Sequence, residues 1–201
     1  MTQSVNPTNR MLEGNIRKTL TEMTIPMVFG MVMLMTFGLV DTFFVSLLGT
    51  QELAAISFTF PVTFTVISLN IGLGIGTSAV IGKLLGANEK AQARLVATTA
   101  LMTVTCLVGI LSIIGINTID PIFTLLGASP ELLVHITDYM VVWYIAGVFL
   151  ALPMVGNSVL RAAGDTKTPS LIMAAGGAIN VALDPLLIFG YGPVPGLGIQ
   201  G

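Results

Sequence analysis

Charged side chains are scarce in this sequence. Asp, Glu, Lys and Arg together make up 9% of its 201 residues, whereas 54% are hydrophobic and the mean hydropathy is +0.92. A water-soluble domain carries about 25% charged residues, which it needs to cover its surface. The composition therefore excludes a soluble globular enzyme and indicates a protein whose solvent is lipid.

Cysteine, histidine and basic clusters are also nearly absent. The chain has one Cys, Cys106, and one His, so it forms no disulfide within itself and offers no Cys/His set for zinc. Cys106 lies in an apolar run, which favours packing over reactivity. A formal net charge of −2 leaves no basic surface for nucleic acid. We therefore expect neither a nucleic-acid partner nor a cofactor.

Five long apolar runs account for most of the chain. Each exceeds the ~20 residues that an α-helix needs to cross a hydrocarbon core about 30 Å thick. We predict an all-α polytopic membrane protein with five transmembrane helices and the start of a sixth near residue 196. The predicted spans lie near residues 23–48, 53–82, 95–119, 132–160 and 170–191.

The eight basic residues occupy only three segments, which are the tail 1–18 and the connections 83–94 and 161–167. The other connections contain neither Lys nor Arg. Because loops rich in Lys and Arg stay in the cytoplasm, we predict a cytoplasmic amino terminus. Within the tail, Met11, Leu12 and Ile16 stand at helical spacing, which predicts a short interfacial helix.

Three acidic residues, Asp41, Asp138 and Asp184, lie inside the predicted spans. An ionisable group there costs at least ~2.5–3.5 kcal/mol on insertion scales, so it usually faces a cavity or a partner. Asp41 lies roughly 12 Å and Asp184 roughly 9 Å of helix before the outer loops, which places both at similar depth.

Asp184 has polar neighbours on its own helix. Asn180 stands one turn earlier on the same face, and Pro185 removes a backbone hydrogen bond beside the acid. Asp41, Asn180 and Asp184 together predict an ion-coupling site for a proton or Na⁺. The alternative is that each acid is paired purely for packing.

Tyr139 and Asn157 are eighteen residues apart, or five helical turns, and therefore share one stripe of the fourth span. We predict that this stripe faces a substrate cavity, and we include Asp138 beside it. Structural alternatives stay open: an interfacial Tyr, an Asn bonded to a neighbouring helix, and an outer-interface cluster of Asp138 with His135. Pro26 and Pro185 interrupt two of the spans as hinges or as static kinks.

Several motifs together resemble the multidrug and toxic compound extrusion (MATE) family of cation-coupled antiporters. They are Val-Asp-Thr at 40–42, Gly-Asp-Thr-Lys-Thr-Pro at 164–169 and Asn-x-x-x-Asp-Pro at 180–185, with further similar stretches at 12–20 and 48–55. The stretches recur in the family's order through the whole chain. Gly38 and Ser46 depart from the pattern, because many relatives carry a polar residue and a Gly there.

The resemblance implies a transporter of twelve helices in two six-helix lobes, functional as a monomer, in the plasma (inner) membrane of a prokaryote. Residues 19–201 would form the amino-terminal lobe, and the carboxyl-terminal lobe would be its missing partner. Asp41, Asn180 and Asp184 match the ion-coupling positions of one prokaryotic branch, with Tyr139 and Asn157 nearby. The implied activity is export of organic cations in exchange for protons or Na⁺ by alternating access.

Two other functions compete with export. A lipid-linked oligosaccharide flippase of related fold would need basic residues in its cavity for phosphate, and no Lys or Arg lies within any run. An intramembrane aspartyl protease pairs Tyr-Asp with Gly-x-Gly-Asp. The acids here read Val-Asp-Thr and Leu-Asp-Pro, which disfavours a protease.

Overall fold

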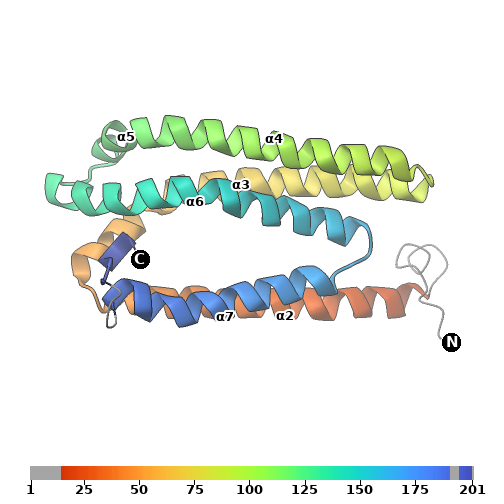
Figure 1. The fold of residues 1–201 in the computed structure, drawn as a ribbon, viewed down its shortest axis with the longest axis horizontal. Helices are drawn as coiled ribbons and strands as arrows, with labels where there is room; N and C mark the ends of the chain where they lie inside the picture. Colours follow the sequence, from red (N-terminus) through yellow and green to blue (C-terminus); the bar gives the residue numbers. More distant parts are fainter. Residues whose placement is uncertain (1–14, 191–194, 201) are drawn as a thin grey trace.

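The structure is a computed structural model that describes residues 15–190 and 195–200. Within these residues the chain is built almost entirely from helices that run side by side (Figure 1). They are α2 (Ile16–Ser46), α3 (Thr50–Gly86), α4 (Lys90–Asn117), α5 (Ile119–Leu125), α6 (Pro130–Ala162), α7 (Lys167–Phe189) and the single 3₁₀ turn η1 (Gly198–Gln200).

Five of these helices, α2, α3, α4, α6 and α7, are long and apolar enough to cross a membrane, which confirms the five predicted spans. Large apolar side chains cover their outer surfaces, as lipid contact requires. The chain is therefore a multi-pass membrane protein. Most of the helices extend past the apolar runs at the ends that carry Lys and Arg, because polar residues continue a helix beyond the hydrocarbon without cost.

The helices form two groups (Figure 1). In the larger group, α6 packs against both α3 and α4, and three clusters of buried side chains join them. Small residues allow close approach: a Cβ atom added at Gly74 would lie 2.6 Å from Ser158 Oγ, and one at Gly115 would overlap the Tyr144 ring. In the smaller group, α2 packs lengthwise against α7.

Side-chain and turn chemistry set the ends of the helices. The Ser129 hydroxyl accepts a hydrogen bond from the Leu132 N–H, and Pro130 occupies the first turn of α6. At the other end of α6, Gly164 has φ +89°, a left-handed conformation that lets the chain turn directly into α7.

Three parts of the structure go beyond what the sequence predicts or fall outside the described residues. The connection after α4, expected to be a loop, contains the short helix α5, whose Ile119 and Phe123 enter the core beside Met140. Near residue 196 the structure has the turn η1. Most of the predicted interfacial helix falls in residues 1–14, outside the described part of the chain.

Candidate functional site

The site is built on the α2–α7 pair, whose register is fixed by two close contacts. Gly30 faces Ser170 and Phe37 faces Gly177, so both contacts join positions 140 apart. The two helices therefore run parallel. The same register places Val40 opposite Asn180 and Phe44 opposite Asp184. Asp41 consequently lies within one turn of Asn180 and within roughly 4.5 Å of Asp184 along the helix axis.

Asp184 is the more enclosed of the two acids. Its side chain is 4% exposed, and its Oδ2 atom is buried without a hydrogen-bond partner within the described residues. The Asn180 amide, one turn earlier on α7 and exposed, does not satisfy that oxygen. Buried polar atoms are normally paired, so Asp184 holds an unused acceptor inside the lobe.

Asp41 links α7 to α6. It is exposed on α2, and its carboxylate lies close enough to act electrostatically on both the Asp184 carboxylate and the Tyr139 hydroxyl. The structure thus places Asp41 of α2 within electrostatic reach of Asp184 on α7 and of Tyr139 on α6. Such a group can bind a proton or a small cation between its oxygens.

The remaining predicted cavity residues lie on α6. Asn157 is half-buried and shares the stripe of Tyr139, five turns further along the helix. Asp138 is half-buried one position before Tyr139, and a rotation of about 100° per residue turns it to a different side of α6. Of these α6 residues, Tyr139 has the electrostatic link to Asp41, and the cavity roles of Asn157 and Asp138 stay predictions.

The Na⁺ ligands and the hinges that we predict from the sequence stay predictions. No three His, Cys, Asp or Glu side chains among the described residues come together as metal ligands, and the predicted set relies on an amide, Asn180, beside two carboxylates. Pro26 and Pro185 lie inside continuous helices, α2 and α7. Both sites stay predictions.

Two further polar residues, Asn70 on α3 and Arg161 on α6, are not among the predicted site residues. Asn70 is 4% exposed, and its Oδ1 atom is the other buried oxygen without a partner among the described residues. Arg161 donates a 3.0 Å hydrogen bond to the Ser158 hydroxyl, which packs on Gly74. An Asn in a charge-free span and an Arg at a span's end were visible signals, but neither spacing nor composition shows which neighbour a side chain meets.

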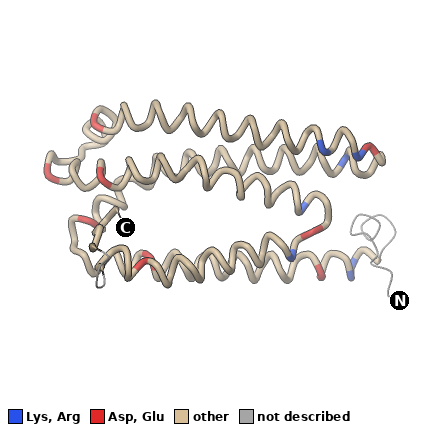
Figure 2. Tube along the Cα trace, in the orientation of Figure 1, with Lys and Arg blue, Asp and Glu red and all other residues tan. Residues whose placement is uncertain are grey.

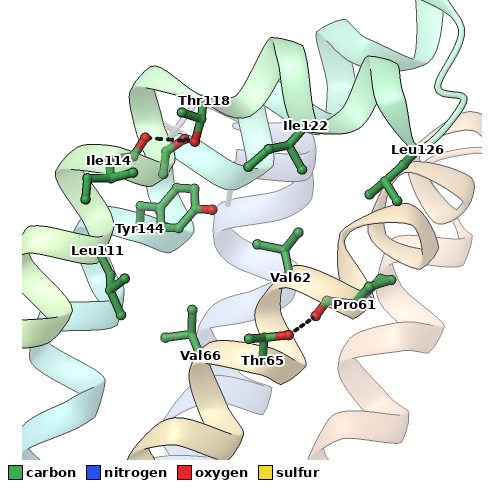
Figure 3. A pocket seen from close by; sticks show the side chains of 11 residues that line it. Pro61, Val62, Thr65, Val66, Leu111, Ile114, Thr118, Ile122, Leu126 and Tyr144 are labelled. Carbon is green, nitrogen blue, oxygen red and sulfur yellow. Dashed lines mark hydrogen bonds between the residues drawn. The ribbon is translucent and has the colours of Figure 1, made fainter.

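A hollow of about 410 Å³ lies elsewhere, between α3, α4, α5 and α6 (Figure 3). Its lining is mostly apolar, and the Thr65 and Thr118 hydroxyls donate to carbonyls of their own helices at 2.7 and 2.8 Å. None of the predicted site residues lines it. The hollow therefore offers little to a charged substrate and is not the predicted site.

The sequence matches the family model described as MatE over residues 26–186. Among curated proteins it is 47% identical over 191 residues to the FAD transporter of Shewanella oneidensis, covering 95% of this chain and 42% of that protein. It is 37% identical to the probable multidrug resistance protein YoeA of Bacillus subtilis (77% of this chain, 33% of that protein). It is 27% identical to the multidrug export protein MepA of Staphylococcus aureus (87% and 39%).

Solved structures agree with the sequence matches. The fold is similar to the outward-facing conformation of a multidrug resistance MATE family transporter of the MOP superfamily, with a TM-score of 0.89, 32% identity and coverage of 98% of this chain and 43% of that one. It is similar at a TM-score of 0.88, with 32% identity and the same coverage, to a MOP superfamily transporter from Pyrococcus furiosus. The chain therefore spans less than half the length of the proteins it matches.

Proposed function

The chain belongs to the MatE family of membrane transporters, and from this premise we propose that it forms the amino-terminal lobe of an exporter driven by protons or Na⁺. The relatives are transporters rather than enzymes, so no catalytic site is assigned. A second lobe would complete the transporter, and one copy of the two-lobed protein would suffice for transport. Alternating access would expose the site first to one side of the membrane and then to the other.

One observation carries the ion-coupling proposal. Asp41 and Asp184 approach each other from α2 and α7, and Asp184 Oδ2 has no hydrogen-bond partner within the described residues. Two neighbouring carboxylates repel when both are charged, so a proton or Na⁺ between them is favourable. Loss of that ion restores the repulsion, which gives the lobe two states that an ion gradient can bias.

Asn180 and Tyr139 extend this site in different directions. Asn180 stands beside Asp41 in the register of α2 and α7, where its amide oxygen is a ligand of the kind that Na⁺ accepts. Tyr139 receives the field of Asp41 from α6 and begins the stripe that leads to Asn157. Movement of α2 and α7 on release of the ion would therefore reach the α6 stripe that we assign to the substrate.

Organic cations are the first substrate class that this site suits. The grouped side chains carry negative charge and no Lys or Arg, so a cationic compound can replace the coupling ion between them. YoeA and MepA, whose names describe multidrug resistance and export, are relatives of this kind. Exchange at one shared pair of acids is the simplest form of antiport.

Flavin adenine dinucleotide is the second candidate substrate. The relative named FAD transporter is 47% identical across 95% of the chain, a higher identity than the 37% and 27% of the two relatives named for multidrugs. Such a dinucleotide is an anion, so its phosphates would need a cationic group away from Asp41 and Asp184. Export of an organic cation and export of FAD, each measured with the same full-length protein, decide between the two candidates.

Orientation follows from the basic residues. All the described Lys and Arg residues lie at one end of the helices (Figure 2). Under the positive-inside rule that end faces the cytoplasm of a prokaryotic cell. The carboxylate group then lies toward the outer side of the inner membrane, from which protons or Na⁺ enter.

The test uses the full-length transporter in vesicles loaded with a fluorescent cation or with FAD. Asp41→Asn and Asp184→Asn should each reach the membrane at the wild-type level. Each should lose at least tenfold in gradient-driven export, because an amide cannot exchange a proton. Asp138→Asn, next to the site, and Asp120→Asn, which changes an exposed residue of α5, should keep most activity. Export by both site variants with unchanged dependence on H⁺ and Na⁺ would refute the coupling role.

A further inference from the structure

Arg161 differs from every other basic residue that the structure describes. The side chains of Arg17, Lys18, Lys83, Lys90, Arg94 and Lys167 are exposed, as expected for a cytoplasmic surface, whereas Arg161 is half-buried. Within the described residues its guanidinium bonds a hydroxyl, that of Ser158, rather than a carboxylate. A partly buried guanidinium that has no carboxylate partner among the described residues can bind an anion through its remaining N–H donors.

The contacts of Ser158 hold this guanidinium in place. Ser158 is 6% exposed and packs against Gly74, where a Cβ atom would come within 2.6 Å of its Oγ. The same hydroxyl donates to the Met154 carbonyl at 3.2 Å and accepts from Arg161 Nη2 at 3.0 Å. The Arg161 side chain is thereby ordered before any ligand arrives, which reduces the entropic cost of binding.

Helix geometry places Arg161 beside the predicted substrate stripe. Successive residues are rotated by about 100°, so Arg161 lies roughly 40° from Asn157, on the side toward Ser158. It is 22 positions after Tyr139, which puts it roughly 33 Å away along α6, at the opposite end of the span. At that separation an anion bound at Arg161 does not contact the Asp41 and Asp184 carboxylates.

We infer that Arg161, with Asn157 one turn before it, binds the phosphate of an anionic organic substrate at the basic end of the lobe. The inference rests on the dinucleotide candidate of the proposed function. The guanidinium supplies paired N–H donors for two phosphate oxygens, and the Asn157 amide meets the organic part of the substrate. The exported anion and the coupling ion then occupy opposite ends of one α6 stripe and do not compete.

Flavin fluorescence tests this site on the purified full-length transporter, because FAD and riboflavin share the ring system but only FAD carries phosphate. Arg161→Gln should weaken FAD binding about tenfold or more, the value of one charge-assisted contact, and leave riboflavin binding unchanged. Arg161→Lys should recover only part of the loss, since an ammonium lacks the paired donors. Lys167→Gln, which removes an exposed charge at the same end, is the matched control and should change neither affinity.

Ionic strength gives an independent readout. The FAD affinity of the wild type should fall as the salt concentration is raised. The affinity of Arg161→Gln should depend less on salt. Equal loss of FAD and riboflavin binding would identify Arg161 as a structural residue and overturn the site. Unchanged FAD binding in Arg161→Gln would overturn the site alone. Absence of FAD binding by the wild type would overturn the dinucleotide candidate together with the site, while the coupling role of Asp41 and Asp184 would still stand.

Discussion

A single side chain, Asp165, closes the amino-terminal end of α7. Its carboxylate accepts hydrogen bonds from the Lys167 and Thr168 N–H groups at 3.1 and 3.0 Å, and from the Thr168 hydroxyl at 2.5 Å. These donors would otherwise lack partners in the first turn of the helix. The Thr168 hydrogen bonds, aided by Lys167, hold the pKa of Asp165 below its ordinary value of 3.8.

Replacing Asp165 tests this cap. Asp165→Ala should destabilise the full-length protein by about 0.5–2 kcal/mol near neutral pH. Because the folded-state pKa is lowered, the stabilisation is present above pH 3.8 and is lost as the pH falls through the lower, folded value. The difference in Tm between wild type and Asp165→Ala should therefore shrink in acid. Asp165→Asn keeps an acceptor that does not titrate, so its Tm difference from Asp165→Ala should vary less with pH.

The residues of the site divide by how visible they are in the sequence. Asp41 and Asp184 could be predicted because a carboxylate inside an apolar run stands out against its surroundings. Asn70 and Arg161 could not, because an uncharged amide and a basic residue at a span's end are common in membrane helices. Only the folded structure shows that Asn70 is 4% exposed and that Arg161 donates to a buried hydroxyl.

At the scale of elements, the contact of α2 with α7 determines how the two carboxylates meet. Gly177 lacks a side chain at the point where the Phe37 ring packs against α7. Further along both helices, the rings of Phe44 and Phe189 meet edge to face, with centroids 6.3 Å apart. This register sets Asp41 opposite the Asn180–Asp184 turn. A shift of either helix by one residue would rotate its acid away by about 100°.

Two neighbouring glycines provide a matched test of this packing. A Cβ atom at Gly177 would overlap the Phe37 ring and come within 2.6 Å of Phe37 Cγ, whereas one at Gly176 meets nothing within 4 Å. Gly177→Ala should therefore cost about 1–3 kcal/mol of stability. It should also reduce ion-coupled export. Gly176→Ala should match the wild type in thermal unfolding and transport, and equal effects of the two changes would contradict the assigned register.

Elements differ in how well the sequence predicts them. The five spans follow from length and hydropathy alone, because lipid demands about 20 apolar residues in a helix. The helix α5 has only seven residues and no apolar run of its own length. It forms because Ile119 and Phe123 are buried against Met140 of α6. A local sequence pattern does not predict such a tertiary contact.

At the scale of the whole molecule, the distribution of charge gives the lobe a direction. The basic residues of three separate segments come together at one end of the helices (Figure 2). Connections at the other end, after α2 and after α5, carry Glu52 and Glu131 in the first turns of α3 and α6 and no basic residue. Folding thus converts a sequence pattern into one cationic face and one face without Lys or Arg, and the membrane potential and anionic lipids favour the cationic face inside.

Two glutamines, one at each face, test this orientation with the same substitution. Gln51 is exposed at the start of α3, and Gln92 is exposed at the start of α4 beside Lys90 and Arg94. In a Cys106→Ala background, Gln51→Cys should react with an impermeant maleimide added outside intact cells. Gln92→Cys should react only after the membrane is opened, because the rule that holds its Lys and Arg neighbours inside also holds this position inside. Labelling of Gln92→Cys but not of Gln51→Cys in intact cells would show that the lobe has the opposite orientation in the membrane. The carboxylates of Asp41 and Asp184 would then lie toward the cytoplasm, and an inward proton or Na⁺ gradient would have to reach them from the opposite side.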